Sequence, residues 1–245
     1  MENKVVIVTG ASSGIGYFTC LELSKAGLRV AAGARRVDKL KHLEKEITKD
    51  NQEFFIQSLD VSKKADCDSF VDSVVRKWGR IDILINNAGL MPLSYFKNAK
   101  VDEWERMIDV NIKGVLYCTS AVIPHMLKKK SGHIINMSSV AGRIVFAGGT
   151  IYCATKHAIT AFSEGLRKEL SPKYNIRVTC IEPGAVSTEL LETITDESMS
   201  GFVQATKNME ILQAEDIAKA VLYAIQAPIH VNINEILIRP TAQER

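Results

Sequence analysis

Thr9-Gly10-Ala11-Ser12-Ser13-Gly14-Ile15-Gly16 directly follows the apolar run Val5-Val6-Ile7-Val8 near the start of this 245-residue chain. A strand that ends in a glycine-rich turn and then opens a helix is typical of a dinucleotide-binding βαβ unit. The glycines permit a tight turn and a close approach of the backbone to a pyrophosphate, which the N–H groups of the helix N-terminus then bind. A purely structural turn is the alternative. The stretch predicts a cofactor loop made of Gly10, Ser12, Ser13, Gly14, Ile15 and Gly16.

Short apolar runs alternate with longer helical patterns along the rest of the chain. The runs predict strands at Lys4–Thr9, Arg29–Ala34, Glu53–Ser58, Ile81–Asn86, Gly132–Met137, Ile176–Ile181 and Glu235–Ile238. Their near-continuous apolar character indicates parallel strands that are buried on both faces. Amphipathic stretches predict helices at Lys39–Lys49, Ala65–Lys77, Val101–Leu127, Thr155–Leu170 and Ala214–Ala227. This order predicts an α/β fold: a doubly wound parallel seven-stranded sheet with helices on both faces (Rossmann), as a single domain over residues 1–245.

The alternation falters in residues 187–212, a segment rich in Thr, Ser, Met and Leu that lies between a strand and a helix. Ligands of doubly wound folds bind outside the carboxyl ends of the strands, and this segment follows one of those ends. We therefore interpret residues 187–212 as a lid over a substrate. A surface excursion is the alternative.

Composition excludes several classes of function. A net charge of +3, with 46% hydrophobic and 24% charged residues, gives no reason to expect nucleic acid or a membrane as a partner. The five cysteines form no C-x-x-C pair and the five histidines no H-x-x-x-H pair, so we expect reduced thiols and no metal site. No secretory signal is recognisable and no apolar stretch approaches about 20 residues. We therefore expect a cytoplasmic protein.

The end of the second predicted strand decides which dinucleotide binds. An acidic residue there would hydrogen-bond the 2′-hydroxyl of NAD, but this chain has Gly33-Ala34-Arg35-Arg36 and no acid before Asp38. A guanidinium pairs with a 2′-phosphate in bidentate fashion and stacks on adenine. We therefore predict NADP(H), with Arg35 as first choice for the phosphate contact and Arg36 as second. The alternative is that one of these arginines is merely solvated.

Two further turns follow predicted strands. Asp60-Val61 comes just after the third strand, where we expect both residues to touch the adenine ring, the aspartate through its carboxylate. Asn86-Asn87-Ala88-Gly89 ends the fourth strand. We expect Asn87, Ala88 and Gly89 to contact the cofactor where the backbone passes close to a ribose, although a turn of this composition is also compatible with a purely structural role.

Tyr152-Cys153-Ala154-Thr155-Lys156 places a phenol and an ammonium four residues apart, with Ser139 thirteen residues upstream. Positions i and i+4 share one face of a helix, so both groups can enter one pocket. A nearby cation favours the phenolate and lowers the tyrosine pKa from about 10 toward the range of an acid/base catalyst. This spacing is common on exposed helices and gains its meaning from the cofactor loop that precedes it.

The ordered set of T-G-x-x-x-G-x-G at 9–16, N-N-A-G at 86–89, Asn111, Ser139, Y-x-x-x-K at 152–156 and Pro183-Gly184 resembles the short-chain dehydrogenase/reductase family. The resemblance covers essentially the whole chain. It implies an active-site tetrad of Asn111, Ser139, Tyr152 and Lys156.

The resemblance also implies a role for each member of the tetrad. Tyr152 would exchange the substrate proton, and Lys156 would lower the pKa of that tyrosine and bind the nicotinamide ribose. Ser139 would donate a hydrogen bond to the substrate oxygen, and Asn111 would hold a water for proton resupply. The nicotinamide itself would be contacted by Pro183, Gly184, Val186 and Thr188.

Residues near these motifs along the chain are candidates for the substrate pocket. They are apolar and suggest hydrophobic substituents on the substrate, although each is also compatible with core packing: Met91, Leu93, Val145, Phe146, Leu190 and Leu191. Arg143 is a cation close to Ser139 in sequence. The C-terminal stretch 232–243 resembles NADP-dependent 3-hydroxy acid (serine-type) dehydrogenases and broad carbonyl reductases, and lacks the V-D-G-G-type end of 3-oxoacyl-carrier-protein reductases.

These features together predict an NADP(H)-dependent oxidoreductase that interconverts a ketone or aldehyde and its alcohol by hydride transfer. The alternatives are a 3-oxoacyl-carrier-protein reductase and a nonenzymatic NADP-binding sensor on the same fold. A sensor has no need for the tetrad, whose four members are all present. The resemblance further implies a homo-oligomer, either a tetramer or a dimer.

Overall fold

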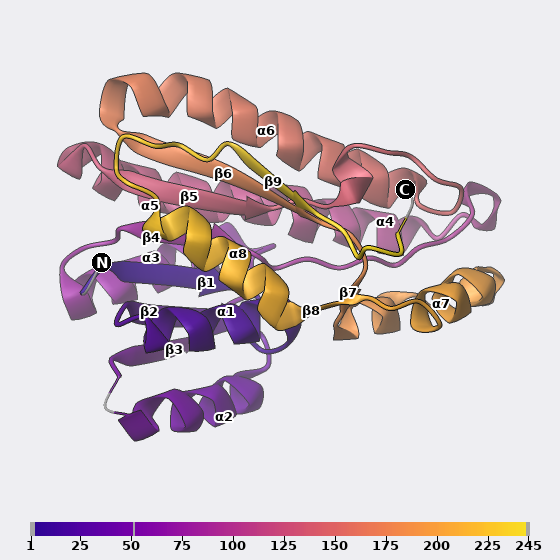
Figure 1. Ribbon diagram of the computed structural model, residues 1–245, viewed down its shortest axis with the longest axis horizontal. Coiled ribbons are helices and arrows are strands. Elements are labelled where there is room, and N and C mark those ends of the chain that lie inside the picture. Colours follow the sequence, from indigo (N-terminus) through magenta and orange to yellow (C-terminus); the bar gives the residue numbers. More distant parts are fainter. Residues whose placement is uncertain (1–2, 51, 244–245) are drawn as a thin grey trace.

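Seven parallel strands form the central sheet of the computed structural model, which describes residues 3–50 and 52–243. Their spatial order is β3-β2-β1-β4-β5-β6-β9 (Figure 1). The strands are β1 (Val5–Thr9), β2 (Arg29–Ala34), β3 (Phe54–Ser58), β4 (Ile83–Asn86), β5 (Gly132–Met137), β6 (Ile176–Pro183) and β9 (Glu235–Ile238). Every strand expected from the sequence is present, with ends shifted by at most two residues. The predicted doubly wound, seven-stranded sheet is confirmed.

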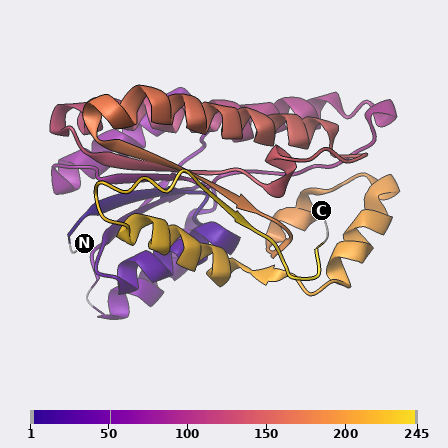
Figure 2. The ribbon, with the colours of Figure 1, turned by 45° about the horizontal axis from the view of Figure 1, so that its top comes forward.

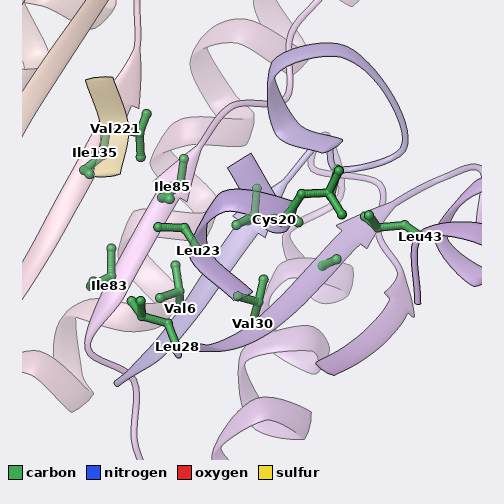
Figure 3. Close-up of a cluster of buried hydrophobic side chains, with 14 of the residues drawn as sticks. Val6, Cys20, Leu23, Leu28, Val30, Leu43, Ile83, Ile85, Ile135 and Val221 are labelled. Carbon is green, nitrogen blue, oxygen red and sulfur yellow. The ribbon is translucent and has the colours of Figure 1, made fainter. Parts of the chain in front are cut away.

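Helices cover both faces of this sheet. They are α1 (Gly14–Lys25), α2 (Val37–Ile47), α3 (Lys64–Trp78), α4 (Val101–Ile108), α5 (Gly114–Lys129), α6 (Thr150–Tyr174), α7 (Ser200–Lys207) and α8 (Ala214–Gln226). Helices α1, α2 and α8 lie on one face, and α3, α5 and α6 lie on the other (Figure 2). Figure 3 shows part of the first core, where Leu23 of α1 and Val221 of α8 belong to one buried cluster with Ile85 and Ile135 of the sheet.

The helix predicted over Val101–Leu127 is interrupted. After α4 the backbone forms a π-helical turn at Asp109–Lys113, and α5 begins only at Gly114. π-turns insert an extra residue into a helix and are frequent at functional sites. Here the wider turn contains Asn111, which is 1% exposed and whose side chain binds the backbone of Leu90. The predicted helix at Thr155–Leu170 is longer than expected, and its early start at Thr150 brings Tyr152 onto the helix.

Strand order reverses between β1 and β4, so the chain leaves these neighbouring strands toward opposite sides of the sheet. Such a reversal opens a crevice at the carboxyl ends of the strands. The segment 187–212 projects beyond that end of the sheet (Figures 1 and 2). It contains α7 and lies between two short parallel strands that the sequence did not predict, β7 (Val186–Ser187) and β8 (Leu212–Gln213). None of the helices in residues 3–50 and 52–243 has the length and apolar character needed to cross a membrane.

Candidate active site

A cavity of about 820 Å³ lies at the carboxyl ends of the strands and brings the sequence motifs together. Its wall includes nineteen of the predicted site residues: Gly10, Ser12, Ser13, Gly14, Ile15, Arg35, Arg36, Asp60, Val61, Asn87, Ala88, Gly89, Ser139, Tyr152, Lys156, Pro183, Gly184, Val186 and Thr188. Gly16 and Asn111 are buried and do not form part of this wall. The volume of the cavity and the chemistry of its wall suit a dinucleotide together with a small substrate.

The glycine-rich loop after β1 is fixed to the turn after β4. The hydroxyl of Thr9 accepts hydrogen bonds from the backbone N–H groups of Asn87 and Ala88, each at 3.1 Å. In return, the amide of Asn87 donates to the carbonyl oxygen of Thr9 at 3.0 Å. Gly10 has a φ of +67°, and a Cβ there would lie 2.7 Å from the Cα of Ala88. The side chain of Asn87 therefore holds the two turns together, in addition to lining the cavity.

The start of α1 is suited to bind an anion. Ser13 is the N-cap residue, yet its side chain makes no capping hydrogen bond, and the first turn of α1 contains no acidic residue. The first N–H groups of a helix have no partner within the helix and carry partial positive charge. Because these groups are left uncapped beside the glycine-rich loop, this end of the cavity fits the pyrophosphate of a dinucleotide.

Of the two candidate arginines, Arg36 is the one in contact with the glycine-rich loop. Its guanidinium donates to the hydroxyl of Ser12 at 3.1 and 3.2 Å and to that of Ser13 at 2.7 Å. Arg35 lines the same cavity but forms no hydrogen bond with the part of the chain that the structure describes. Arg36 therefore contacts the glycine-rich loop and Arg35 does not, while the choice of Arg35 as the phosphate contact stays a prediction. The carboxylate of Asp60 accepts hydrogen bonds from the N–H and hydroxyl of Ser62.

Tyr152 and Lys156 meet in the cavity from the N-terminal part of α6, and both are buried. The Nζ atom of Lys156 lies 5.7 Å from the centre of the Tyr152 ring and donates to the carbonyl oxygen of Met137 at 2.9 Å. Ser139 follows β5, and its hydroxyl donates to the carbonyl oxygen of Pro183 at 3.3 Å. The neighbouring Ser138 donates instead to the backbone of Lys156 at 3.0 Å.

Burial shifts the pKa values of the tyrosine and the lysine in opposite directions. It raises the pKa of Tyr152 to about 12, against the opposing effect of a hydrogen bond with Ser139. It lowers the pKa of Lys156 from its usual 10.5 to about 8. Desolvation of the phenolate is the main cause of the raised pKa of Tyr152, and the expectation that Lys156 lowers this pKa stays a prediction. A phenol with a raised pKa remains protonated at neutral pH, as a proton donor must.

Asn111 supports the cavity from behind. Its Oδ1 atom accepts from the N–H of Leu90 at 3.0 Å, and its Nδ2 atom donates to the carbonyl oxygen of Leu90 at 2.9 Å. The same Nδ2 atom donates to Thr155 on α6 at 3.2 Å. A Cβ added to Gly89 would lie 3.4 Å from Asn111 Oδ1 and 3.9 Å from Lys156 Nζ, so both residues approach this glycine. Asn111 thus connects the turn after β4 to the helix that carries the tyrosine.

The predicted substrate pocket is only partly correct. Met91, Phe146, Leu190 and Leu191 line the cavity. Leu93 does not, because it is 1% exposed within a hydrophobic cluster, and Val145 does not, because its side chain is 71% exposed to solvent. Hydrophobicity alone does not distinguish these environments in a loop.

Four charged residues in the cavity wall were missed: Glu103, Arg106, Glu189 and Glu192. Glu103 accepts a hydrogen bond from Thr195 through one oxygen, while its buried Oε2 atom has no partner among the described residues. Glu103 and Arg106 are three residues apart on α4, and such pairs occur on any solvated helix. The sequence alone gave no sign that this face of α4 borders a cavity.

Arg143, the cation close to Ser139 in sequence, pairs with two carboxylates. Its Nε atom donates to both carboxylate oxygens of Glu182, at 2.9 and 3.0 Å, and it also pairs with Glu235. Glu182 is fully buried in β6, directly before Pro183, so it requires a positive partner. The arginine therefore joins the loop after Ser139 to the strand that carries the Pro183-Gly184 turn.

The segment 187–212 contacts both sides of the cavity. Thr193 accepts a hydrogen bond from the N–H of Met91 at 3.0 Å, and Asp196 accepts one from Asn98 at 2.6 Å. At its other end, Glu189 pairs with Arg36 beside the glycine-rich loop. No group of three or more His, Cys, Asp or Glu residues suited to hold a metal occurs in the described ranges. All five cysteines are buried free thiols.

Known proteins resemble both the sequence and the fold. Residues 4–199 match the family model of short chain dehydrogenases. An uncharacterised oxidoreductase of Staphylococcus saprophyticus is 47% identical, over 99% of this chain and 98% of its own length. The closed form of a serine dehydrogenase complexed with NADP+ has a TM-score of 0.91 at 38% identity, covering 98% of this chain and 96% of that one. For the serine dehydrogenase of Escherichia coli the TM-score is 0.83 at 36% identity, with 98% and 100% covered. The chain belongs to the short-chain dehydrogenase/reductase family of oxidoreductases.

Proposed function

We propose that the protein is an NADP(H)-dependent oxidoreductase that interconverts a ketone or aldehyde and its alcohol. The observation that carries this proposal is the convergence of Tyr152, Ser139 and Lys156 in one cavity with an uncapped helix N-terminus and an arginine-bearing loop. The NADP+ in the related serine dehydrogenase complex supports the choice of cofactor.

The bound cofactor would supply or accept the hydride, and the chain's own residues handle the proton. In reduction, the neutral phenol of Tyr152 donates its proton to the substrate oxygen as negative charge develops there. The hydroxyl of Ser139, whose bond to Pro183 is long at 3.3 Å, turns to donate to the same oxygen. Lys156 then stabilises the phenolate that remains, and Asn111 supports a water that returns a proton. In oxidation the proton moves in the opposite direction.

The cofactor assignment is tested through the two arginines. Arg36→Ala and Arg35→Ala should each be compared with the parent protein for binding of NADPH and NADH. We expect a far larger loss of affinity for NADPH than for NADH, with the greater loss in Arg36→Ala, because only NADPH carries the 2′-phosphate. Equal losses for the two cofactors would contradict the assignment.

The cavity wall suggests the kind of substrate. Apolar side chains and the charged groups of Glu103 and Arg106 border the same space. The carboxylate of Glu103 is suited to bind an ammonium group, and Arg106 to bind a carboxylate. We propose small alcohols with charged substituents, such as serine and other 3-hydroxy acids, as the substrates to test first. The names of two related serine dehydrogenases support this choice.

A panel of carbonyl compounds and alcohols, followed at the nicotinamide absorbance with both cofactors, tests the reaction. Turnover of 3-hydroxy acids is the expected result. Preferential reduction of 3-oxoacyl-carrier-protein would favour the first alternative, and tight NADPH binding without turnover of any panel member would favour the nonenzymatic sensor. We also propose that residues 187–212 cover the substrate, since Thr193 and Thr195 connect them to Met91 and Glu103 in the wall of the cavity.

A further inference from the structure

The segment 187–212 begins directly above the glycine-rich loop. A Cβ added to Gly14 would lie 3.0 Å from the Cγ2 atom of Thr188, so these two parts of the chain are in close contact. Thr188 is the N-cap of a short 3₁₀ turn, Glu189–Thr193, and its hydroxyl accepts from the N–H of Leu190 at 3.3 Å. The first side chain of this turn, Glu189, therefore lies beside the cofactor loop.

Glu189 is bound there by two cations. One carboxylate oxygen lies 2.7 Å from Nη1 of Arg36 and the other 2.5 Å from Nζ of Lys39. Hydrogen bonds from Lys39 and then from Arg36 lower the pKa of Glu189 to about 2, so the group is ionised at neutral pH. All three side chains are between 35% and 48% exposed, which leaves the ion pairs accessible to an incoming ligand.

The same guanidinium is suited to a phosphate. Arg36 donates its Nε and Nη2 N–H groups to the hydroxyls of Ser12 and Ser13 in the glycine-rich loop. Carboxylate and phosphate oxygens both accept from the fork of a guanidinium, so one face of Arg36 cannot bind both fully at once. An anionic cofactor group that reaches Arg36 must therefore share or replace the bond to Glu189.

We propose that Glu189 is a cofactor-specificity residue, a lid carboxylate that neutralises Arg36 and Lys39 until the 2′-phosphate of NADP(H) takes its place. The inference rests on the proposed function, because it takes NADP(H) as the cofactor. It adds Lys39 and Glu189 to the site that recognises the 2′-phosphate. It also means that the first turn of the segment 187–212 responds to which cofactor is bound, since NADH leaves the ion pairs intact.

The size of the effect follows from the exposure of the ion pairs. Two half-exposed pairs must be broken, and the carboxylate must move away from a group with about two negative charges. Removing the carboxylate should therefore tighten NADPH binding by about 3- to 30-fold. NADH carries no 2′-phosphate, so its affinity should change by less than about twofold. Because the competition is between exposed charges, the gain for NADPH should shrink as salt is added.

The test is direct titration of the full-length protein with NADPH and with NADH, without a carbonyl substrate, at low and high salt. Glu189→Gln removes the charge but keeps the shape, and Glu189→Ala provides a second variant with the same expected result. Glu197→Gln is the matched control, because Glu197 is an exposed carboxylate in the same segment that forms no ion pair with the described residues. We expect both Glu189 variants to bind NADPH more tightly than the parent protein does. The control should bind NADPH with the parent affinity.

The outcomes separate this inference from the function on which it rests. If the parent protein prefers NADPH, but the Glu189 variants bind it no more tightly, the inference is wrong and the cofactor assignment survives. Weaker binding of both cofactors in the variants would likewise overturn it, and would identify Glu189 as a general closure contact. If the parent protein binds NADPH no better than NADH, the cofactor assignment fails and the inference fails with it.

Discussion

Asn111→Ala should destabilise the protein far more than the loss of one polar side chain usually does. Asn111 is 1% exposed and satisfies both the N–H and the carbonyl oxygen of Leu90, itself 8% exposed. A buried backbone group left without a partner costs about 1–3 kcal/mol. Two such groups, with some relief from water entering the vacated space, give an expected loss of about 2–4 kcal/mol in the free energy of unfolding.

Urea denaturation at a fixed protein concentration, followed by circular dichroism, measures this loss. Asn208→Ala is the control, because Asn208 is exposed at the end of α7 and accepts a single hydrogen bond from Gln204. We expect the control to change the free energy of unfolding by less than about 0.5 kcal/mol. If Asn111→Ala loses less than about 1 kcal/mol, the Leu90 backbone has found other partners. The supporting role that we assign to Asn111 would then be wrong.

Three further predictions concern the lysine, the buried ion pair and the glycine-rich loop. Since the pKa of Lys156 is lowered to about 8, its ammonium loses a proton above that pH. In steady-state kinetics the rate of carbonyl reduction should therefore fall about tenfold for each pH unit above about 8. A rate that stays constant to about pH 10 would contradict this. Arg143→Ala leaves the fully buried Glu182 without a cation and should lower the free energy of unfolding by about 2–3 kcal/mol in urea denaturation. The loss is smaller than for a fully buried pair because Arg143 is 38% exposed. A loss below about 1 kcal/mol would refute this prediction. A Cβ at Gly16 would lie 2.5 Å from a backbone oxygen, so Gly16→Ala should weaken NADPH binding about 5- to 100-fold in a fluorescence titration. The control Gly165→Ala, whose Cβ would meet open space, should bind NADPH as the parent does. Equal affinities in the two variants would contradict the role of the glycine-rich loop in cofactor binding.

The sheet could be predicted from sequence because strands that are buried on both faces appear as short apolar runs. Strands β1 and β4 are apolar except for their last residue, and both are buried along their whole length. The glycine-rich turn after β1 was likewise predictable, since its Gly10 and Gly14 have positive φ angles that glycine adopts without strain. Elements whose conformation is set by neighbouring residues in the sequence were therefore predicted at the right positions.

What the sequence did not reveal depends on contacts between distant segments. Glu103 borders the cavity because the segment around Thr195, 92 residues away, packs against it. Arg143 pairs with the buried carboxylate of Glu182, 39 residues further along. The π-turn at Asn111 likewise reflects the position of Leu90 and not the helical pattern around it. The pKa of Tyr152 is governed by the depth of burial, which a spacing of four residues does not report.

The most direct test of the account is Tyr152→Phe, which removes the hydroxyl and leaves the ring. With a substrate identified by the panel, we expect carbonyl-dependent oxidation of NADPH to fall about 10²- to 10⁴-fold, because the proton donor is lost. The dissociation constant for NADPH, measured by titration of the same variant, should stay within about threefold of the parent value, since the loop and the arginine are untouched. Undiminished turnover in Tyr152→Phe would contradict the central claim that this phenol supplies the proton.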